Sequence, residues 1–353
     1  MFDVEKLVRP NVKALTPYSS ARDEFKGEAS VFLDANENSL GSPLVKWYNR
    51  YPDPLQWKVK EKLATIKAVK PEQIFIGNGS DECIDLLYRA FCNPGKDNII
   101  ICPPTYGMYE VSANINDVEI RKAPLLDDYQ LNLAHIEQLV DENTKIIWLC
   151  SPNNPSGNSL NLHDMEMVLN NFEGLVVIDE AYINFARQAS ALKWLDEYPN
   201  LVVMQTLSKA WGLAGLRLGM MFASVEIIQV TNRIKPPYNI GQHTQELVAQ
   251  ALDEVGQVND MIRALVDMRE ALAEVLEQMA IVKRVYPSDA NFLLVQVDHA
   301  RGIYDYLLTK GIVVRDRSKV ILCDDCLRIT VGTEAENTRL VDALADYMET
   351  LLN

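Results

Sequence analysis

The stretch Lys145-Ile146-Ile147-Trp148-Leu149-Cys150 runs directly into Ser151-Pro152-Asn153-Asn154-Pro155-Ser156-Gly157. Its first half is a nearly continuous apolar run, which is typical of a strand buried on both faces of a parallel sheet. Its second half is a polar turn at the carboxyl end of that strand, where open α/β sheets bind their ligands. This stretch therefore predicts both the class of fold and the place of a site.

Two later stretches repeat this pattern of an apolar strand with a polar end. Residues 175–178 lead into Asp179-Glu180-Ala181-Tyr182, and residues 201–204 lead into Gln205-Thr206-Leu207-Ser208-Lys209. Each end alone is a weak sign, since Asn-Pro loops are ordinary turns and an Asp after a strand often caps a helix. Because the carboxyl ends of parallel strands share one edge of a sheet, we expect Asn154, Asp179 and Lys209 to meet there.

The rest of the chain predicts a large α/β domain followed by a smaller α+β domain. Further strands are predicted at 74–76, 98–102, 291–297, 311–315 and 326–331, and helices at 56–66, 82–92, 243–280 and 336–352. The long helical region after residue 243 lacks Pro and contains a single Gly, which favours one or two long helices. We place the boundary between the domains in or near these helices.

The composition limits the classes of function. Of the 353 residues, 34 are Lys or Arg and 49 are Asp or Glu, which gives a formal net charge of −15, and 48% are hydrophobic. These values fit a globular protein with a large core and exclude a disordered or collagen-like chain. The acidic balance argues against a nucleic-acid partner, which usually leaves a basic footprint. An anionic ligand would need positive groups concentrated in one site.

We expect a cytoplasmic protein that spans no membrane and holds no metal. Residues 1–6 lack the basic start and apolar run of a signal peptide, and no stretch approaches the roughly 18 apolar residues of a membrane span. The six cysteines are thinly spread, as reduced thiols are, and the four histidines form no metal-like spacing. The pair Cys323 and Cys326 leaves zinc or redox work open, although a turn with two ordinary thiols is favoured.

Three motifs stand at the ends of the predicted strands: Asn-Pro-Ser-Gly (154–157), Asp-Glu-Ala-Tyr (179–182) and Ser-Lys-Ala-Trp-Gly-Leu-Ala-Gly-Leu-Arg-Leu-Gly (208–219). Together they resemble the fold-type I aminotransferases that use pyridoxal 5′-phosphate. Motifs over nearly the whole chain are similar to the histidinol-phosphate aminotransferases of this fold: residues 9–18, 33–38, 49–52, 77–82, 102–109 and 326–332.

The resemblance implies a domain organisation and a role for each cofactor residue. Residues 1–35 would pack with a small domain of residues 241–353, beside a large cofactor domain of residues 36–240. Lys209 would attach the cofactor and move the proton as general base and acid. Asp179 would hold the pyridine nitrogen protonated, and Asn154 and Tyr182 would bond the ring's phenolic oxygen.

The resemblance also implies the groups around the cofactor ring and phosphate. Tyr106 would stack on the ring, although an ordinary core tyrosine stays open. Donors to the phosphate would come from a helix start and from nearby side chains. They are Ser80, Asp81, Thr206, Ser208 and Arg217. Tyr51 would reach the phosphate in the partner subunit, so that the site is composite and the protein is a homodimer.

The substrate residues follow from the same resemblance. Arg328 would meet the anionic group of the substrate, Arg315 would be a second phosphate-facing arginine, and Tyr18 would line the phosphate pocket. Asn38 is a neighbour in this set. An exposed ion pair of Arg315 with Asp316 or Asp324 is the alternative reading of that residue. The positive charge of these arginines would admit an anion into an acidic protein.

The activity implied is transamination of L-histidinol phosphate with 2-oxoglutarate, giving imidazole acetol phosphate and L-glutamate in L-histidine biosynthesis. An aromatic amino-acid aminotransferase and a threonine-phosphate decarboxylase of the same fold are the alternatives. A non-catalytic ligand sensor on this scaffold is a third, and the intact pair of Lys209 and Asp179 argues against it.

Overall fold

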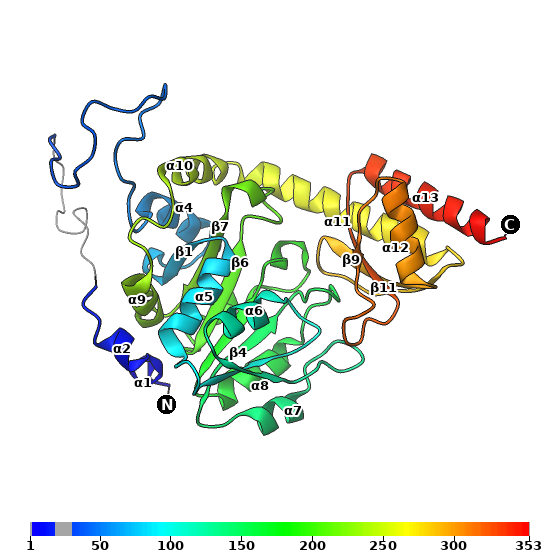
Figure 1. Cartoon of the computed structure of the whole chain (residues 1–353), viewed down its shortest axis with the longest axis horizontal. Coiled ribbons are helices and arrows are strands. Elements are labelled where there is room, and N and C mark those ends of the chain that lie inside the picture. The colour runs from blue at the N-terminus through cyan, green and yellow to red at the C-terminus, as the bar shows by residue number, and fades with distance from the viewer. Residues whose placement is uncertain (1, 18–29, 353) are drawn as a thin grey trace.

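The computed structural model of the chain describes residues 2–17 and 30–352. These residues form a large lobe and a small lobe, and the long helix α11 (Val255–Glu277) runs from one to the other (Figure 1). Each lobe is built on its own sheet, of seven strands in the large lobe and four in the small one.

The large sheet has the strand order β1-β7-β6-β5-β4-β2-β3. Its strands are β1 (Ile74–Asn78), β2 (Asn98–Ile101), β3 (Glu119–Lys122), β4 (Thr144–Cys150), β5 (Leu175–Asp179), β6 (Leu201–Thr206) and β7 (Leu218–Ala223). The five strands from β3 to β6 pair in parallel, whereas β7 is antiparallel to both of its neighbours. The expected mostly parallel central sheet is confirmed.

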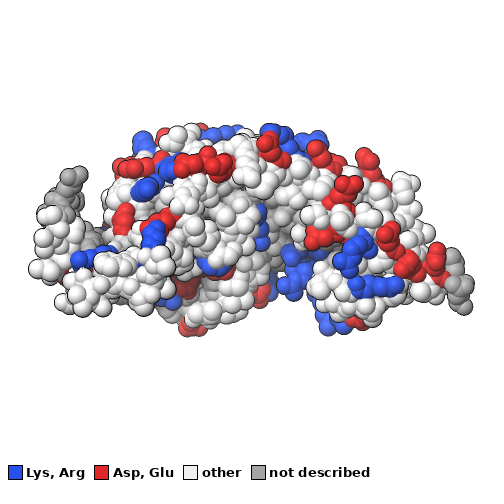
Figure 2. Space-filling model, turned by 90° about the horizontal axis from the view of Figure 1, so that it is seen from above, with Lys and Arg blue, Asp and Glu red and all other residues white. Residues whose placement is uncertain are grey.

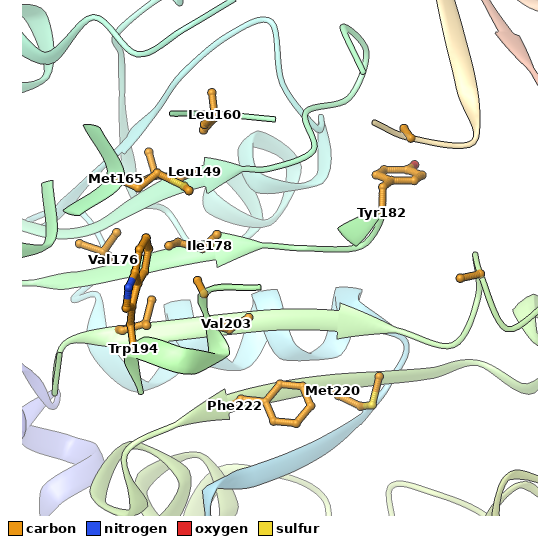
Figure 3. Close-up of a cluster of buried hydrophobic side chains, with 14 of the residues drawn as sticks. Leu149, Leu160, Met165, Val176, Ile178, Tyr182, Trp194, Val203, Met220 and Phe222 are labelled. Atoms are coloured by element: carbon orange, nitrogen blue, oxygen red, sulfur yellow. The ribbon is translucent and has the colours of Figure 1, made fainter. Parts of the chain in front are cut away.

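The central strands are apolar throughout because both of their faces are covered. Alternate side chains of β4 point to opposite faces, so Ile147 and Leu149 join one buried cluster while Ile146 and Trp148 join another. Helices α4 (Trp57–Lys67), α7 (Leu133–Leu139), α8 (Leu162–Asn171) and α10 (Gln242–Ala251) supply the first cluster, and α5 (Ser80–Phe91), α6 (Met108–Ile115) and α9 (Val225–Ile234) the second. Figure 3 shows part of the first cluster, with Tyr182 just beyond the end of β5.

The register of the central strands sets where the polar strand ends lie. Cys150 at the end of β4 lies opposite Asp179 at the end of β5, and Asp179 in turn lies opposite Met204 on β6. The three ends are therefore side by side at one edge of the sheet, and the polar turns that follow them leave from that edge.

The small lobe is an antiparallel sheet of order β10-β11-β9-β8 with helices packed on it. Its elements are β8 (Val282–Val285), β9 (Phe292–Val297), β10 (Arg315–Asp316), β11 (Cys326–Thr330), α12 (Ala300–Thr309) and α13 (Glu334–Leu352). Short 3₁₀ turns occur at Pro71–Gln73, Ile183–Phe185, Ala191–Trp194 and Ala214–Leu216. On α11, the buried Arg269 donates hydrogen bonds to the carbonyls of Ala290 (2.9 Å) and Phe185 (3.5 Å), which ties the helix to both lobes.

The N-terminal residues differ from the expectation. Helices α1 (Val4–Leu7) and α2 (Pro10–Lys13) lie on the large lobe, where Val8 and Val12 join the buried cluster of α5. The backbone N–H of Arg9 also donates to the carbonyl of Ala90 at 3.0 Å. The two valines lie on either side of Arg9, and the surface that they cover belongs to α5 and not to the small lobe. The described residues 2–17 therefore do not follow the expected packing of residues 1–35.

The expected boundary at residue 240 stays a prediction. Helix α10 follows that residue, yet its Val248 belongs to the same buried cluster as Leu63 of α4. Lys62 of α4 also donates to the carbonyl of Ala249 at 2.9 Å.

Among the described residues, no helix is both long enough and apolar enough to cross a membrane.

Replacing Gly219 by Ala tests how closely β7 approaches the start of α5. A Cβ at Gly219 would lie 2.3 Å from the backbone nitrogen of Ser80, so β7 and α5 would have to move apart. We expect a loss of about 1–3 kcal/mol in the free energy of unfolding, measured by urea denaturation. The control is Gly256→Ala on α11, whose Cβ would meet nothing within 4 Å. This control should be neutral or slightly stabilising, and equal unfolding midpoints for both variants would contradict the close approach.

Candidate active site

A cavity of about 540 Å³, partly open to solvent, lies at the edge of the large sheet where β4, β5 and β6 end. The cavity is lined by Ser80, Asp81, Tyr106, Asn154, Asp179, Tyr182, Thr206, Ser208, Lys209 and Arg217, together with Cys150 and Ala181, which the sequence analysis did not single out. The structure therefore brings most of the expected cofactor residues to one place.

Asp179 lies at the base of the cavity and is 3% exposed. Its Oδ2 accepts a hydrogen bond from the hydroxyl of Tyr109 at 2.6 Å, and its Oδ1 accepts one from the backbone N–H of Ala181 at 3.0 Å. Burial raises the pKa of the Asp179 carboxyl, while the bonds from Tyr109 and Ala181 lower it. The sequence analysis assigned Tyr109 no role: the residue ends the motif of residues 102–109, but it lies 70 residues before Asp179, so no spacing indicates this contact.

Lys209 follows β6 and extends along the cavity with its Nζ 5.6 Å from the centre of the Tyr182 ring. Partial burial of the amine lowers the pKa of Lys209, and the positive charge of Arg328 lowers it further. The carboxylate of Asp179 acts in the opposite direction and raises it. The balance leaves more of the amine unprotonated at neutral pH than an ordinary lysine would have, which favours reaction with a carbonyl group.

The start of α5 and Arg217 form a close pair beside the cavity. The N–H of Gly79 donates to the carbonyl of Arg217 at 2.8 Å, and a Cβ at Gly79 would lie 2.4 Å from the Arg217 guanidinium. Arg217 itself has a positive φ of 53°, a left-handed conformation that it shares with eight other non-glycine residues of the described chain. A guanidinium and the free N–H groups of a helix start are the groups that bind a phosphate.

Two neighbours of this pair are already engaged with the protein. Arg217 Nη2 lies 3.6 Å from a carboxylate oxygen of Asp81. The hydroxyl of Thr206 donates to the carbonyl of Leu218 at 3.2 Å and accepts from the N–H of Ser208 at 3.0 Å. The hydroxyl of Thr206 therefore fixes the turn that leads to Lys209, whereas Arg217 is the charged donor nearest the start of α5.

The small lobe reaches the cavity through β9 and β11. Arg328 on β11 donates a hydrogen bond from Nη1 to Oδ1 of Asn154, and its guanidinium carbon lies 5.2 Å from the centre of the Phe292 ring. Tyr182 contacts the same Phe292 ring edge-on, with the ring centres 5.1 Å apart. The expected substrate arginine thus meets two of the expected cofactor residues.

Three arginines of the β10–β11 hairpin, Arg315, Arg317 and Arg328, form a group that we call the arginine cluster. Arg315 pairs with Arg328 in the strand register, and Arg317 follows two residues later. Burial raises the pKa of Tyr182, and the positive charges of Arg328 and Arg317 oppose this rise. Basic side chains gather along the hollow between the lobes in Figure 2, whereas acidic ones lie mainly on the outer surface.

The arginine cluster is free of carboxylate partners. In the part of the chain that the structure describes, none of the three forms an ion pair, and Asp316 lies 4.0 Å from Arg301 instead. The Nε of Arg317 is buried without a hydrogen-bond partner. Sequence reasoning missed Arg317, although its spacing of two from Arg315 in an extended segment is a signal for a shared face. Uncompensated guanidinium groups are suited to an anion with several acceptor oxygens.

Of the expected site residues that the structure describes, Tyr51, Asn38, Arg315 and Arg328 are not among those that line the cavity. Tyr51 is exposed and stacks on Tyr238 with the ring centres 4.4 Å apart. Asn38 is exposed, and its side-chain oxygen accepts from the N–H of Leu40 at 3.0 Å. Tyr18 lies outside the described residues. The roles of these residues stay predictions.

Cys323 and Cys326 are buried free thiols joined by a turn, in which the N–H of Cys326 donates to the carbonyl of Cys323 at 3.0 Å. Burial raises the pKa of Cys323 to about 11, so the reactive thiolate is scarce at neutral pH. Nowhere in residues 2–17 and 30–352 do three acidic, His or Cys side chains gather as metal ligands would.

The chain belongs to the class I and II aminotransferase family, whose model matches residues 45–344. It is 54% identical over 346 residues to the histidinol-phosphate aminotransferase of Cytophaga hutchinsonii, which covers 98% of this chain and 99% of that protein.

Two solved structures share the fold. The histidinol-phosphate aminotransferase of Clostridium acetobutylicum has a TM-score of 0.79 at 23% identity and covers 86% of this chain and 92% of its own. That of Sinorhizobium meliloti, solved in complex with pyridoxal 5′-phosphate, has a TM-score of 0.77 at 24% identity and covers 86% and 83%.

Pyridoxal 5′-phosphate is the cofactor of this family, and the cavity has the groups that it needs. Lys209 offers an amine of lowered pKa to its aldehyde, and Asp179 offers a buried carboxylate to its ring nitrogen. Gly79 and Arg217 offer close-packed backbone and a guanidinium to its phosphate. The donor set therefore fits the cofactor.

Replacing Arg328 by Gln tests the electrostatic control of Lys209. Because the charge of Arg328 lowers the pKa of Lys209, its removal raises that pKa. The unprotonated amine then appears only at higher pH, so the midpoint of cofactor attachment to the apoprotein moves to higher pH. The absorbance of the attached cofactor, titrated against pH, measures this midpoint. The control is Arg301→Gln, which removes an exposed arginine paired with Asp305 and should leave the midpoint unchanged. An unshifted midpoint in Arg328→Gln would count against the coupling.

Proposed function

We propose that the protein transfers the amino group of L-histidinol phosphate to 2-oxoglutarate, giving imidazole acetol phosphate and L-glutamate, in L-histidine biosynthesis. The observation that carries this proposal is the arginine cluster, which forms no ion pair among the described residues and reaches the cavity of Lys209 and Asp179 through the contact of Arg328 with Asn154. A substrate with a phosphate at one end and an amine at the other matches this arrangement. The relative at 54% identity, named for the same activity, supports it.

The residues of the chain divide the chemical work between them. When bound, pyridoxal 5′-phosphate supplies an aldehyde that accepts amines and a protonated ring that withdraws electrons. Asp179 keeps a proton on the ring nitrogen. Its carboxylate is buried, and a buried negative charge is stabilised by a positive charge beside it. Lys209 would take the proton from the substrate's Cα as general base and deliver it to the cofactor's C4′ carbon as general acid. Asn154 and Tyr182 bond the phenolic oxygen, and Tyr106 covers the ring.

The far end of the substrate meets the arginine cluster. Arg328 is held by Asn154 and by the Phe292 ring, so its guanidinium is oriented before the substrate arrives. Arg315 and Arg317 add further donors, and Arg317 has a buried N–H that an anion would satisfy. A phosphate can use all three, whereas the carboxylate of 2-oxoglutarate or glutamate needs only one or two.

A half-reaction screen tests the substrate. The cofactor-loaded protein is mixed separately with histidinol phosphate, phenylalanine and threonine phosphate, and the cofactor spectrum is followed. We expect histidinol phosphate to react fastest. Equal rates with phenylalanine would favour an aromatic aminotransferase, and release of CO₂ from threonine phosphate would favour a decarboxylase. A wild type that takes up cofactor and leaves all amines unchanged would favour a sensor.

Arg317→Gln in the same assay tests the phosphate end. We expect the rate with dilute histidinol phosphate to fall about tenfold or more, because a hydrogen bond between charged groups is lost. The rate with phenylalanine, which has no phosphate, should change little. The control is Lys319→Gln, which removes a neighbouring exposed positive charge and so measures the effect of net charge alone. Equal losses with both substrates would contradict a phosphate role for Arg317.

We further propose that the protein is a cytoplasmic homodimer with composite sites. Residues 30–52, which we call the arm, extend away from the large lobe in Figure 1. The arm exposes Leu40 (89%), Val45 (108%) and Trp47 (62%), an apolar set that a second copy would cover. Tyr51 stands at the end of this arm, which favours its placement in the partner's site.

The six cysteines, all free and buried, favour a reducing compartment.

Mixing two inactive variants tests the composite site. Lys209→Ala and Tyr51→Ala are each expected to lose most activity, since one lacks the amine and the other the donor to the partner's phosphate. In a heterodimer, the Lys209 of one chain and the Tyr51 of the other restore one intact site. After exchange of subunits we expect about a quarter of wild-type activity, from the statistics of a symmetric dimer. Activity that stays at the level of the separate variants would exclude a shared site.

A further inference from the structure

We propose that Tyr109 is a positioning residue for the reaction, whose phenolic O–H fixes the orientation and the charge of the Asp179 carboxylate. The inference deepens the proposed function and rests on it, because it assumes that Asp179 faces the cofactor's ring nitrogen. Tyr109 lies behind Asp179, does not line the cavity and would not touch the substrate.

Tyr109 is held in place on several sides. It is fully buried on α6, and its ring stacks on Trp148 of β4 with the centres 4.7 Å apart and the planes at 17°. Tyr106 contacts the ring edge-on at 5.6 Å, and the hydroxyl of Tyr88 donates to the backbone carbonyl of Tyr109 at 2.9 Å. Such a clamped ring presents its hydroxyl to Asp179 at a fixed point, at 2.6 Å.

The two donors to Asp179 act on different oxygens. Tyr109 bonds Oδ2 and the backbone N–H of Ala181 bonds Oδ1, so together they fix the plane of the carboxylate. Among the described residues, Tyr109 is the only side chain that donates a hydrogen bond to Asp179. The N–H of Ala181 belongs to the chain turn itself, and this leaves Tyr109 as the donor that a substitution can remove.

The other charged or titratable groups near Asp179 do not replace this donor. They are Asp81 and Cys83 on α5, Tyr106 before α6, Cys150 at the end of β4, Tyr182 after β5 and Lys209 after β6. Of these, Lys209 lowers the pKa of Asp179 and Asp81 raises it, so their charges oppose each other. Burial is the largest influence and raises that pKa, which leaves the hydrogen bond of Tyr109 as the largest influence in the other direction.

Tyr109→Phe removes the hydroxyl and keeps the ring, so the contact with Trp148 is retained. Without its donor, the pKa of Asp179 rises further, and less of the carboxylate is charged at neutral pH. We expect the dissociation constant of pyridoxal 5′-phosphate from the apoprotein to rise about tenfold, the effect of losing one hydrogen bond to a charged group. The acid limb of the activity profile should also move to higher pH.

A double-mutant cycle separates positioning from packing. In an Asp179→Asn background the charge is already absent, so adding Tyr109→Phe should change the cofactor's dissociation constant less than about twofold. The same loss in both backgrounds would overturn the inference, because Tyr109 would then act independently of Asp179. This readout requires only binding, and activity of the loaded enzyme is not needed.

Tyr129→Phe is the matched control. It also removes the hydroxyl of a buried tyrosine, which donates to the backbone carbonyl of Leu322 at 2.7 Å and contacts neither Asp179 nor Tyr109. Thermal unfolding should show that both single variants fold with similar losses of stability, while cofactor affinity falls only in Tyr109→Phe. Equal affinity losses in the two variants would overturn the inference. A wild type that does not take up the cofactor would instead overturn the proposed function, whereas uptake unaffected by Tyr109→Phe would overturn this inference alone.

Discussion

The register of β4, β5 and β6 is the constraint on which the rest of the structure depends. Cys150, Asp179 and Met204 lie side by side because three strands that are buried on both faces cannot slip without exposing apolar side chains. The turns that carry Asn154, Tyr182 and Lys209 all begin at that line of strand ends. The Asn154 loop, the turn with Tyr182 and the turn with Lys209 are therefore positioned relative to one another by the core. Hydrogen bonds between the strand ends, such as that from the N–H of Glu180 to the carbonyl of Met204 at 2.7 Å, add to this.

Charge in this protein is organised by lobe. The chain as a whole carries a formal charge of −15, yet the cavity is lined by Lys209 and Arg217, and Arg328 of the arginine cluster contacts its lining residue Asn154. The large lobe supplies the buried carboxylate and the amine, and the small lobe supplies the cluster through β10 and β11. The two sets meet at the contact of Arg328 with Asn154. Binding of an anion therefore depends on both lobes, while attachment of the cofactor depends mainly on the large one.

Continuous apolar runs made five of the seven strands of the large sheet predictable, and local motifs indicated most of the residues that line the cavity. The strand Leu218–Ala223 was not predicted, although it is apolar and buried throughout. The strands Glu119–Lys122 and Val282–Val285 escaped prediction because they lie at sheet edges and are rich in charged residues, so they lack a buried pattern. The bond from Tyr109 to Asp179 joins distant segments and leaves no periodic trace. The N-terminal valines pack on α5 because α5 presents an apolar surface to them. The sequence alone does not show which apolar surface such a segment will cover.

Helix α11 gives the molecule a mechanical property. Its 23 residues make a rod of about 35 Å at 1.5 Å per residue, with Arg269 fastened to carbonyls of both lobes. A tilt of about 5° at one end of such a rod displaces the other by roughly 3 Å, more than a hydrogen bond to a guanidinium tolerates. The stiffness of α11 thus limits how far the arginines of the small lobe move relative to the large lobe. Substitutions along α11, far from the cavity, can therefore change the affinity for a substrate.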